Sequence, residues 1–185
     1  MKRTISLFFA LVIAMSAICC AASAGETFKT PYFTLTLPNG WLIDTSEADA
    51  AVDDNGEQFL GVFGDDDAIG MIVEAYLVHY DDLKDVSLWN YSDAELKDYA
   101  DSLMEEFEDD DPAYLGIVKA GQIPFVLIKA TDEDGEYLYA DTMTNGYAIE
   151  LCAYITDEEA ETMYPITEKH IEQFKSILAT FQPVS

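Results

Sequence analysis

Carboxylates are the most abundant side chains in this sequence that could take part in chemistry. Asp and Glu together number 36 among 185 residues, and their oxygens are the hard ligands that calcium prefers. Acidic clusters occur at residues 65–67, 105–111 and 132–136. In the third cluster, Asp132 and Asp134 precede Gly135 and Glu136 follows it, although no complete calcium loop continues from there. Asp132, Asp134 and Glu136 are therefore the candidate metal ligands, with a solvated acidic loop as the alternative interpretation.

Side chains that commonly serve as nucleophiles or general bases are few. His79 lies at the end of an expected strand and His170 in the first turn of an expected helix, and neither belongs to a recognisable signature with Cys152. The sequence also has no zinc-protease motif, C-x-x-C, P-loop or dinucleotide fingerprint. We therefore predict no catalytic residue and no cofactor-binding residue. Cys152 is expected to act as a small buried hydrophobe.

Two carboxylates interrupt apolar runs with strand character. Glu74 and Glu150 each lie in the middle of such a run, and we expect both to be partly exposed at a sheet edge. A carboxylate buried in a strand without a partner would have a raised pKa and would mark a functional site. Hydrolysis by a pair of acids stays open, because suitable residues occur throughout the chain.

The N-terminus has the features of a secretory signal. Two basic residues precede an apolar run at 5–18, which is shorter than the ~20 residues that span a bilayer, and Ala-Ser-Ala follows at 22–24. This pattern predicts cleavage after Ala24. The alternative is a lipoprotein signal that uses Cys19 or Cys20, although neither cysteine follows a small residue. We therefore expect a secreted or periplasmic protein.

The charge of the remaining chain excludes several partners. Residues 25–185 contain seven lysines, no arginine and all 36 acidic residues, which gives a formal charge of −29. Nucleic acids and anionic lipid surfaces attract clusters of Lys and Arg and would repel this chain. Cations and basic protein surfaces remain compatible with it, and solubility or adaptation to salt is the simpler explanation of the charge. No later apolar stretch predicts a transmembrane segment.

The pattern of apolar residues predicts an α+β domain. Residues 123–155 contain three apolar runs separated by Asp-Gly and Asn-Gly, which favour tight turns between paired strands. Ser92 and Glu95 have capping-box spacing before a helix expected to end near Phe107, and a second helix is expected from Thr167. Further strands are predicted at 32–37, 41–43, 58–64, 69–80 and 114–120. We predict one domain, residues 25–185, with an antiparallel sheet of about six strands sandwiched by helices.

Several segments together resemble the PsbP-like superfamily, which includes the DcrB-like bacterial envelope proteins. They are FTLTLPNGW at 33–41, the helix from Ser92 after two central strands, the meander from Ile123, and the closing helix ending in SILATF at Phe181. The resemblance implies an antiparallel sheet between helices and a role in binding or assembly. It supplies no catalytic motif, and the excess of Asp and Glu is not typical of the family.

The sequence thus predicts an exported, acidic, non-enzymatic domain that binds an unidentified protein partner or small ligand at the cell envelope. Two alternatives remain open at this point. One is a secreted hydrolase that depends on carboxylates or a metal, and the other is a calcium-responsive or salt-adapted surface protein.

Overall fold

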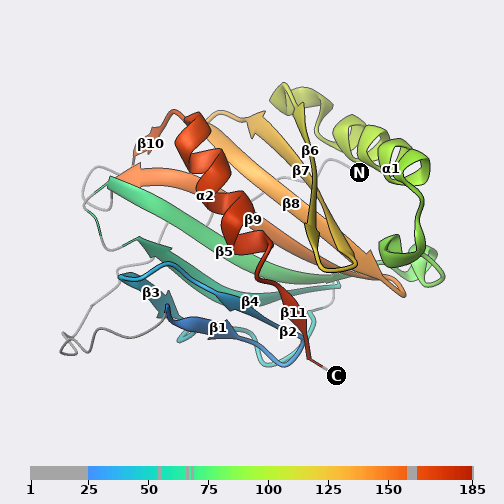
Figure 1. Ribbon diagram of the computed structural model, residues 1–185, viewed down its shortest axis with the longest axis horizontal. Helices are drawn as coiled ribbons and strands as arrows, with labels where there is room; N and C mark the ends of the chain where they lie inside the picture. The colour runs from blue at the N-terminus through green and yellow to red at the C-terminus, as the bar shows by residue number, and fades with distance from the viewer. Residues whose placement is uncertain (1–24, 54–55, 66, 68, 158–161, 185) are drawn as a thin grey trace.

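The computed structural model describes residues 25–53, 56–65, 67, 69–157 and 162–184 (Figure 1). The expected signal segment, residues 1–24, lies outside this part of the chain. A large antiparallel sheet forms the centre of the structure, with the path β3-β4-β5-β9-β8-β7-β6 and β10 paired to the end of β9. Its strands are β3 (Trp41–Asp44), β4 (Glu57–Asp65), β5 (Ile69–His79), β6 (Ala113–Ala120), β7 (Ile123–Thr131), β8 (Glu136–Thr144), β9 (Tyr147–Asp157) and β10 (Thr162–Tyr164).

The expectation of an α+β domain with a large antiparallel sheet is confirmed, but the sheet has eight strands rather than about six. A second sheet joins the two ends of the described chain. It has the order β1 (Thr27–Lys29), β2 (Phe33–Thr36), β11 (Gln182–Pro183). Strands β1, β10 and β11 were not predicted, because two or three residues are too few to show an alternating pattern.

The two expected turns of the meander differ in the structure. Asn145 and Gly146 both have positive φ, 51° and 78°, as a tight hairpin turn between β8 and β9 requires. Between β7 and β8, however, the last paired residues are Thr131 and Glu136, so the connection is a four-residue loop. Only Gly135 has positive φ there, and the prediction of a tight Asp-Gly turn is wrong.

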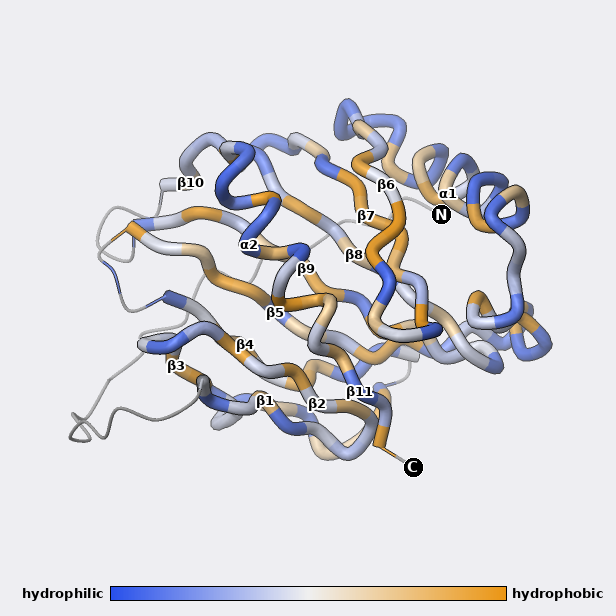
Figure 2. Tube along the Cα trace, viewed as in Figure 1, coloured by the Kyte–Doolittle hydropathy of each residue, from blue (hydrophilic) through white to orange (hydrophobic). Residues whose placement is uncertain are grey.

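Each face of the large sheet carries a separate core. Figure 2 shows many apolar residues along β4, β5 and β7. On one face, Phe174 and its neighbours on α2 (Glu168–Leu178) pack with Leu138 and Leu151 and with the small sheet, and α2 lies across this face in Figure 1. On the other face, Leu103 and Ala100 of α1 (Asp93–Glu106) pack with residues of β7 and β8.

The start and end of α1 follow local chemistry. The Ser92 backbone N–H donates to the Glu95 carboxylate (2.7 Å), and the Ser92 hydroxyl accepts from the Glu95 backbone N–H (3.4 Å), so the expected capping box is confirmed. The helix ends at Glu106, before an acidic run that its C-terminal dipole disfavours. Neither helix of the described chain has the length and apolar character needed to cross a bilayer.

Candidate functional site

Tyrosines and carboxylates gather on the face of the sheet that α1 partly covers. Residues on this face alternate along β5, β9 and β8. Glu74 lies opposite Cys152, and Glu150 lies opposite Tyr76 on one side and Asp141 on the other. Because β5 and β9 are central strands, the expectation that Glu74 and Glu150 lie at a sheet edge is wrong. The sheet instead places both carboxylates at its centre.

Helices and turns cover this face unevenly. Helix α1 packs mainly against β6 and β7, and the short 3₁₀ helix η2 (Leu88–Asn90) packs against β7 and β8. On β4, β5 and β9 a set of side chains on the same face stays half-buried. We call this set the open strip: it consists of Phe59, Ile72, Glu74, Tyr76, Cys152 and Tyr154.

Glu74 is the central residue of the open strip. Its two carboxylate oxygens each accept a hydrogen bond from a tyrosine hydroxyl, from Tyr76 at 2.8 Å and from Tyr154 at 2.9 Å. The ring of Tyr76 also packs against Phe59, with centroids 5.3 Å apart. No lysine or histidine of the described chain forms an ion pair with Glu74. The tyrosines therefore orient a negative charge without neutralising it.

Asp141 and Glu150 occupy the covered part of the same face. Asp141 is 2% exposed and Glu150 is 9% exposed, and the two residues are direct cross-strand neighbours. Tyr99 of α1 donates to Asp141 Oδ1 (2.7 Å), and Tyr80 donates to Glu150 Oε1 (2.8 Å). These bonds tie α1 and the segment before it to the sheet, since buried carboxylates require donors. Glu150 is therefore buried with a donor, Tyr80, that lies just beyond the end of β5.

The hydroxyls of this face stay protonated far above neutral pH. Burial, followed by the negative charge of Asp141, raises the pKa of Tyr99 well above its usual range. Burial and the charge of Glu74 do the same to the pKa of Tyr154 and of Tyr76. Burial also raises the pKa of Tyr139, with Glu150 as the next cause. These tyrosines are hydrogen-bond donors at neutral pH and are poorly suited to act as bases.

Cys152 is half-buried and packs beside the core under α1. Burial, with the nearby charge of Glu74, raises the pKa of its thiol well above the usual range. A nucleophilic cysteine needs the opposite shift. The sequence interpretation of Cys152 as a small apolar residue therefore agrees with its surroundings.

The two histidines lie apart from this face and from each other. His79 stacks on Tyr147, with ring centroids 4.5 Å apart, and its Nδ1 is 3.8 Å from Asp81. His170 Nδ1 accepts a hydrogen bond from the Thr167 backbone N–H (3.2 Å) at the start of α2. Burial, and then the charge of Lys169, lowers the pKa of His170. In these positions each histidine supports a turn or a helix end.

The candidate metal ligands have structural partners in the β7–β8 loop. Asp132 Oδ1 accepts from the backbone N–H groups of Asp134 (2.8 Å) and Gly135 (3.0 Å), which forms a side-chain-capped turn. Glu136 pairs with Lys129 (2.9 Å) and accepts from the Ile166 backbone N–H (2.7 Å). Within the described residues, Asp132, Asp134 and Glu136 do not form a group that could hold a metal ion. Asp132 and Glu136 thus have hydrogen-bond partners within the fold, whereas Asp134 takes part through its backbone N–H.

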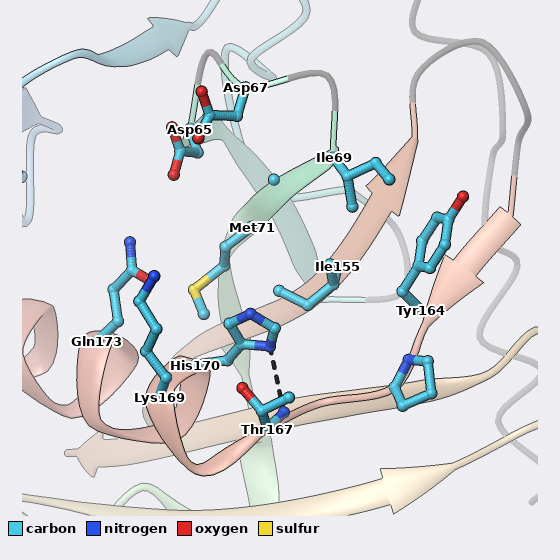
Figure 3. A pocket seen from close by; sticks show the side chains of 12 residues that line it. Asp65, Asp67, Ile69, Met71, Ile155, Tyr164, Thr167, Lys169, His170 and Gln173 are labelled. Atoms are coloured by element: carbon cyan, nitrogen blue, oxygen red, sulfur yellow. Dashed lines mark hydrogen bonds between the residues drawn. The ribbon is translucent and has the colours of Figure 1, made fainter.

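A separate hollow opens on the other side of the molecule, between the start of α2 and the ends of β5 and β9 (Figure 3). We call it the α2 pocket; its volume is about 430 Å³. Met71 and Ile155 lie at its apolar centre, Lys169 and Gln173 reach toward it from α2, and Asp65 lies across from them. The remaining lining residues are Asp67, Ile69, Gly70, Tyr164, Pro165, Thr167 and His170.

Sequence reasoning found part of this arrangement. It singled out Glu74 and Glu150 as carboxylates in apolar runs, but it missed Asp141 and the tyrosine donors. Asp141 shows the same pattern, a carboxylate in the interior of a buried strand. The α2 pocket had no sequence signal, since its walls come from segments about a hundred residues apart.

No model of a known protein family matches this chain, and no curated protein matches its sequence. Among solved structures, the chain is similar to PsbP (CyanoP) of the cyanobacterium Synechocystis sp. PCC 6803. The TM-score is 0.47 at 12% identity, over 92% of this chain and 99% of that one. It is also similar to a protein from Bacteroides thetaiotaomicron, with a TM-score of 0.45 at 15% identity over 88% of this chain.

The chain spans half the length of that Bacteroides protein. Both TM-scores lie below 0.5, so neither protein's role is transferred to this chain, and a DcrB-like relationship stays a prediction. At the level of the fold, the similarity to CyanoP agrees with the PsbP-like resemblance of the sequence.

Proposed function

We propose that this protein is an exported, non-enzymatic binding domain that holds a positively charged segment of a protein partner against the open strip. One observation carries the proposal. Glu74 presents a half-buried, oriented carboxylate at the centre of a sheet, and no cation of the described chain pairs with it. A lysine or arginine side chain from a partner would supply the missing charge.

The surroundings of Glu74 suit such a side chain. Tyr76 and Tyr154 place aromatic rings beside the carboxylate, and Phe59 and Ile72 extend the apolar surface along β4 and β5. Lys and Arg carry apolar stems below their charged groups, and aromatic rings attract cations. The open strip would therefore contact the stem as well as the charge, and an uncharged or acidic segment would leave Glu74 without a cationic partner.

The net charge supports the same partner. At −29 for residues 25–185, the domain would attract basic surfaces over a distance comparable to the Debye length, about 8 Å at physiological ionic strength. This attraction is general, because acidic residues occur over the whole surface. Specificity must then come from the open strip, and a test has to separate the two contributions.

We expect Glu74→Gln to weaken the binding of a tetralysine peptide, capped at both ends, by roughly ten-fold. The reason is that a hydrogen bond to a charged group contributes about 1.5–3 kcal/mol. Glutamine keeps one oxygen that accepts from one tyrosine, and its amide N–H can donate to the hydroxyl oxygen of the other, so the fold should be retained. The measurement is isothermal titration calorimetry at 150 mM salt, with circular dichroism to confirm folding.

The matched control is Glu105→Gln, which removes the same charge from an exposed position on α1. General attraction would make the two variants equivalent, whereas the open strip predicts less than a two-fold change for Glu105→Gln. Equal losses in both variants, or no loss in either, would rule out Glu74 as the contact.

Export is the second part of the proposal. If residues 1–24 are a cleaved signal, the mature protein recovered from the expressing cell's envelope or medium begins at Gly25. Intact-mass measurement checks this directly, and the variant Cys19→Ala/Cys20→Ala should be processed in the same way. A mature N-terminus at Cys19 or Cys20 that carries lipid would contradict cleavage after Ala24 and would place the protein on a membrane surface.

A further inference from the structure

The α2 pocket differs from the open strip in having opposite charges on its two sides. Lys169 and Gln173 project from successive turns of α2, and Asp65 and Asp67 lie across the hollow from them (Figure 3). The pocket volume, about 430 Å³, falls within the range of small-molecule sites, about 300–1,000 Å³. Size alone therefore allows a ligand larger than a single ion.

The opposite charges do not pair with each other. Lys169 takes part in none of the ion pairs of the described chain, although two carboxylates line the same hollow. On the same helix, Lys175 pairs with Glu172 at 3.0 Å. The separation leaves space in which a ligand could contact the ammonium group on one side and the carboxylates on the other.

The region between the charges is apolar. Met71 and Ile155, which are 3% and 4% exposed, lie at its centre. Tyr164 and Ile69 line its side. His170 adds no positive charge at neutral pH, since burial and Lys169 lower its pKa. Lys169 is therefore the positive group of this lining, and an apolar body can occupy the centre.

We propose that the α2 pocket binds a small zwitterion with an apolar body, such as an apolar amino acid or dipeptide with free ends. Lys169 and Gln173 would hold its carboxylate, Asp65 and Asp67 its ammonium group, and Met71 and Ile155 its side chain. A simple anion would be repelled by the aspartates, and a simple cation would leave the Lys169 ammonium group without a partner. A molecule with both charges satisfies both sides of the pocket. This site is independent of the open strip and of the proposed protein partner.

Calorimetric titration of the mature protein with leucine, leucyl-leucine and N-acetyl-leucyl-leucine amide tests the proposal. We expect one or both free-ended compounds to bind at millimolar or lower concentration, and the doubly capped compound to bind at least ten-fold more weakly. Binding of leucine alone would identify the ligand as an amino acid, and binding of leucyl-leucine alone would identify it as a peptide.

Lys169→Gln and Asp65→Asn should each weaken that binding by at least ten-fold, since each removes one charged contact. The matched controls Lys175→Gln and Asp98→Asn remove the same charges from other helix positions and should change binding by less than two-fold. Absence of heat with both free-ended compounds, equal binding of the capped compound, or equal losses in the control variants would each overturn the proposal. The capped tetralysine peptide has no free ends, so its binding to the open strip is a separate result.

Discussion

Raising the pH from 10 to 11 is expected to lower the free energy of unfolding by at least about 3 kcal/mol. Tyr99, Tyr139 and Tyr154 supply this loss, because their pKa values in the folded protein lie well above the ordinary value of 10.0. Burial also raises the pKa of Tyr76 and of Tyr137, and both add to it. Above pH 10 the unfolded chain releases these protons and the folded chain keeps them. Each such group lowers stability by about 1 kcal/mol between pH 10 and 11 and by about 1.4 kcal/mol per pH unit above that, because the unfolded tyrosine is half ionised at pH 10. Well below pH 10 their contribution is fully present.

Urea unfolding between pH 8 and 11.5, followed by circular dichroism, measures this loss. Tyr99→Phe should reduce the loss between pH 10 and 11 by about 1 kcal/mol, because one titrating group is gone. Tyr147→Phe changes an exposed tyrosine and should leave the loss unchanged. If tyrosinate absorbance at 295 nm rises to its full value while the circular dichroism is still native, the buried hydroxyls are not protected and the prediction fails.

Phe174→Ala is expected to lower the free energy of unfolding by about 3–5 kcal/mol. Phe174 is fully buried on α2 and belongs to the core that α2 shares with the large and small sheets. Its loss would leave a cavity at the junction of three elements that cannot all close on it. Chemical denaturation of the wild-type and variant proteins gives the difference directly.

Ser176→Ala is the control for this variant, because Ser176 is exposed on the same helix. A change within about 0.5 kcal/mol is expected for such a surface position. If Phe174→Ala changes stability no more than this control does, α2 does not anchor the fold as the packing indicates.

Local patterns accounted for most of the fold. The sequence predicted the long strands, the Ser92–Glu95 capping box and the Asn145-Gly146 turn. The pattern that indicates each of them lies within a short stretch of neighbouring residues. The short strands were not predicted, because a strand such as β11 forms only when β2 lies beside it. The number of strands in the sheet was therefore underestimated.

The candidate site was less accessible to sequence reasoning, and strand order is the reason. The sequence predicts an edge position for Glu74 and Glu150, because a carboxylate in a strand is most readily solvated there. The pairing of β5 with β9 instead brings them to the centre, and Tyr80 and Tyr154 supply the donors. The Glu74–Tyr154 contact joins residues 80 positions apart, a relation that a single sequence does not contain.

The small sheet imposes an order on folding. Its middle strand, β2, pairs on one side with β1 and on the other with β11, so that Phe33 lies beside Pro183. The strands synthesised first therefore cannot reach their native environment until the last strand has left the ribosome. Contacts of such long sequence separation form slowly, so the pairing of β11 with β2 is expected to be a late step in folding. Late closure of this kind would assist the proposed export, because a chain in a translocation channel is still unfolded.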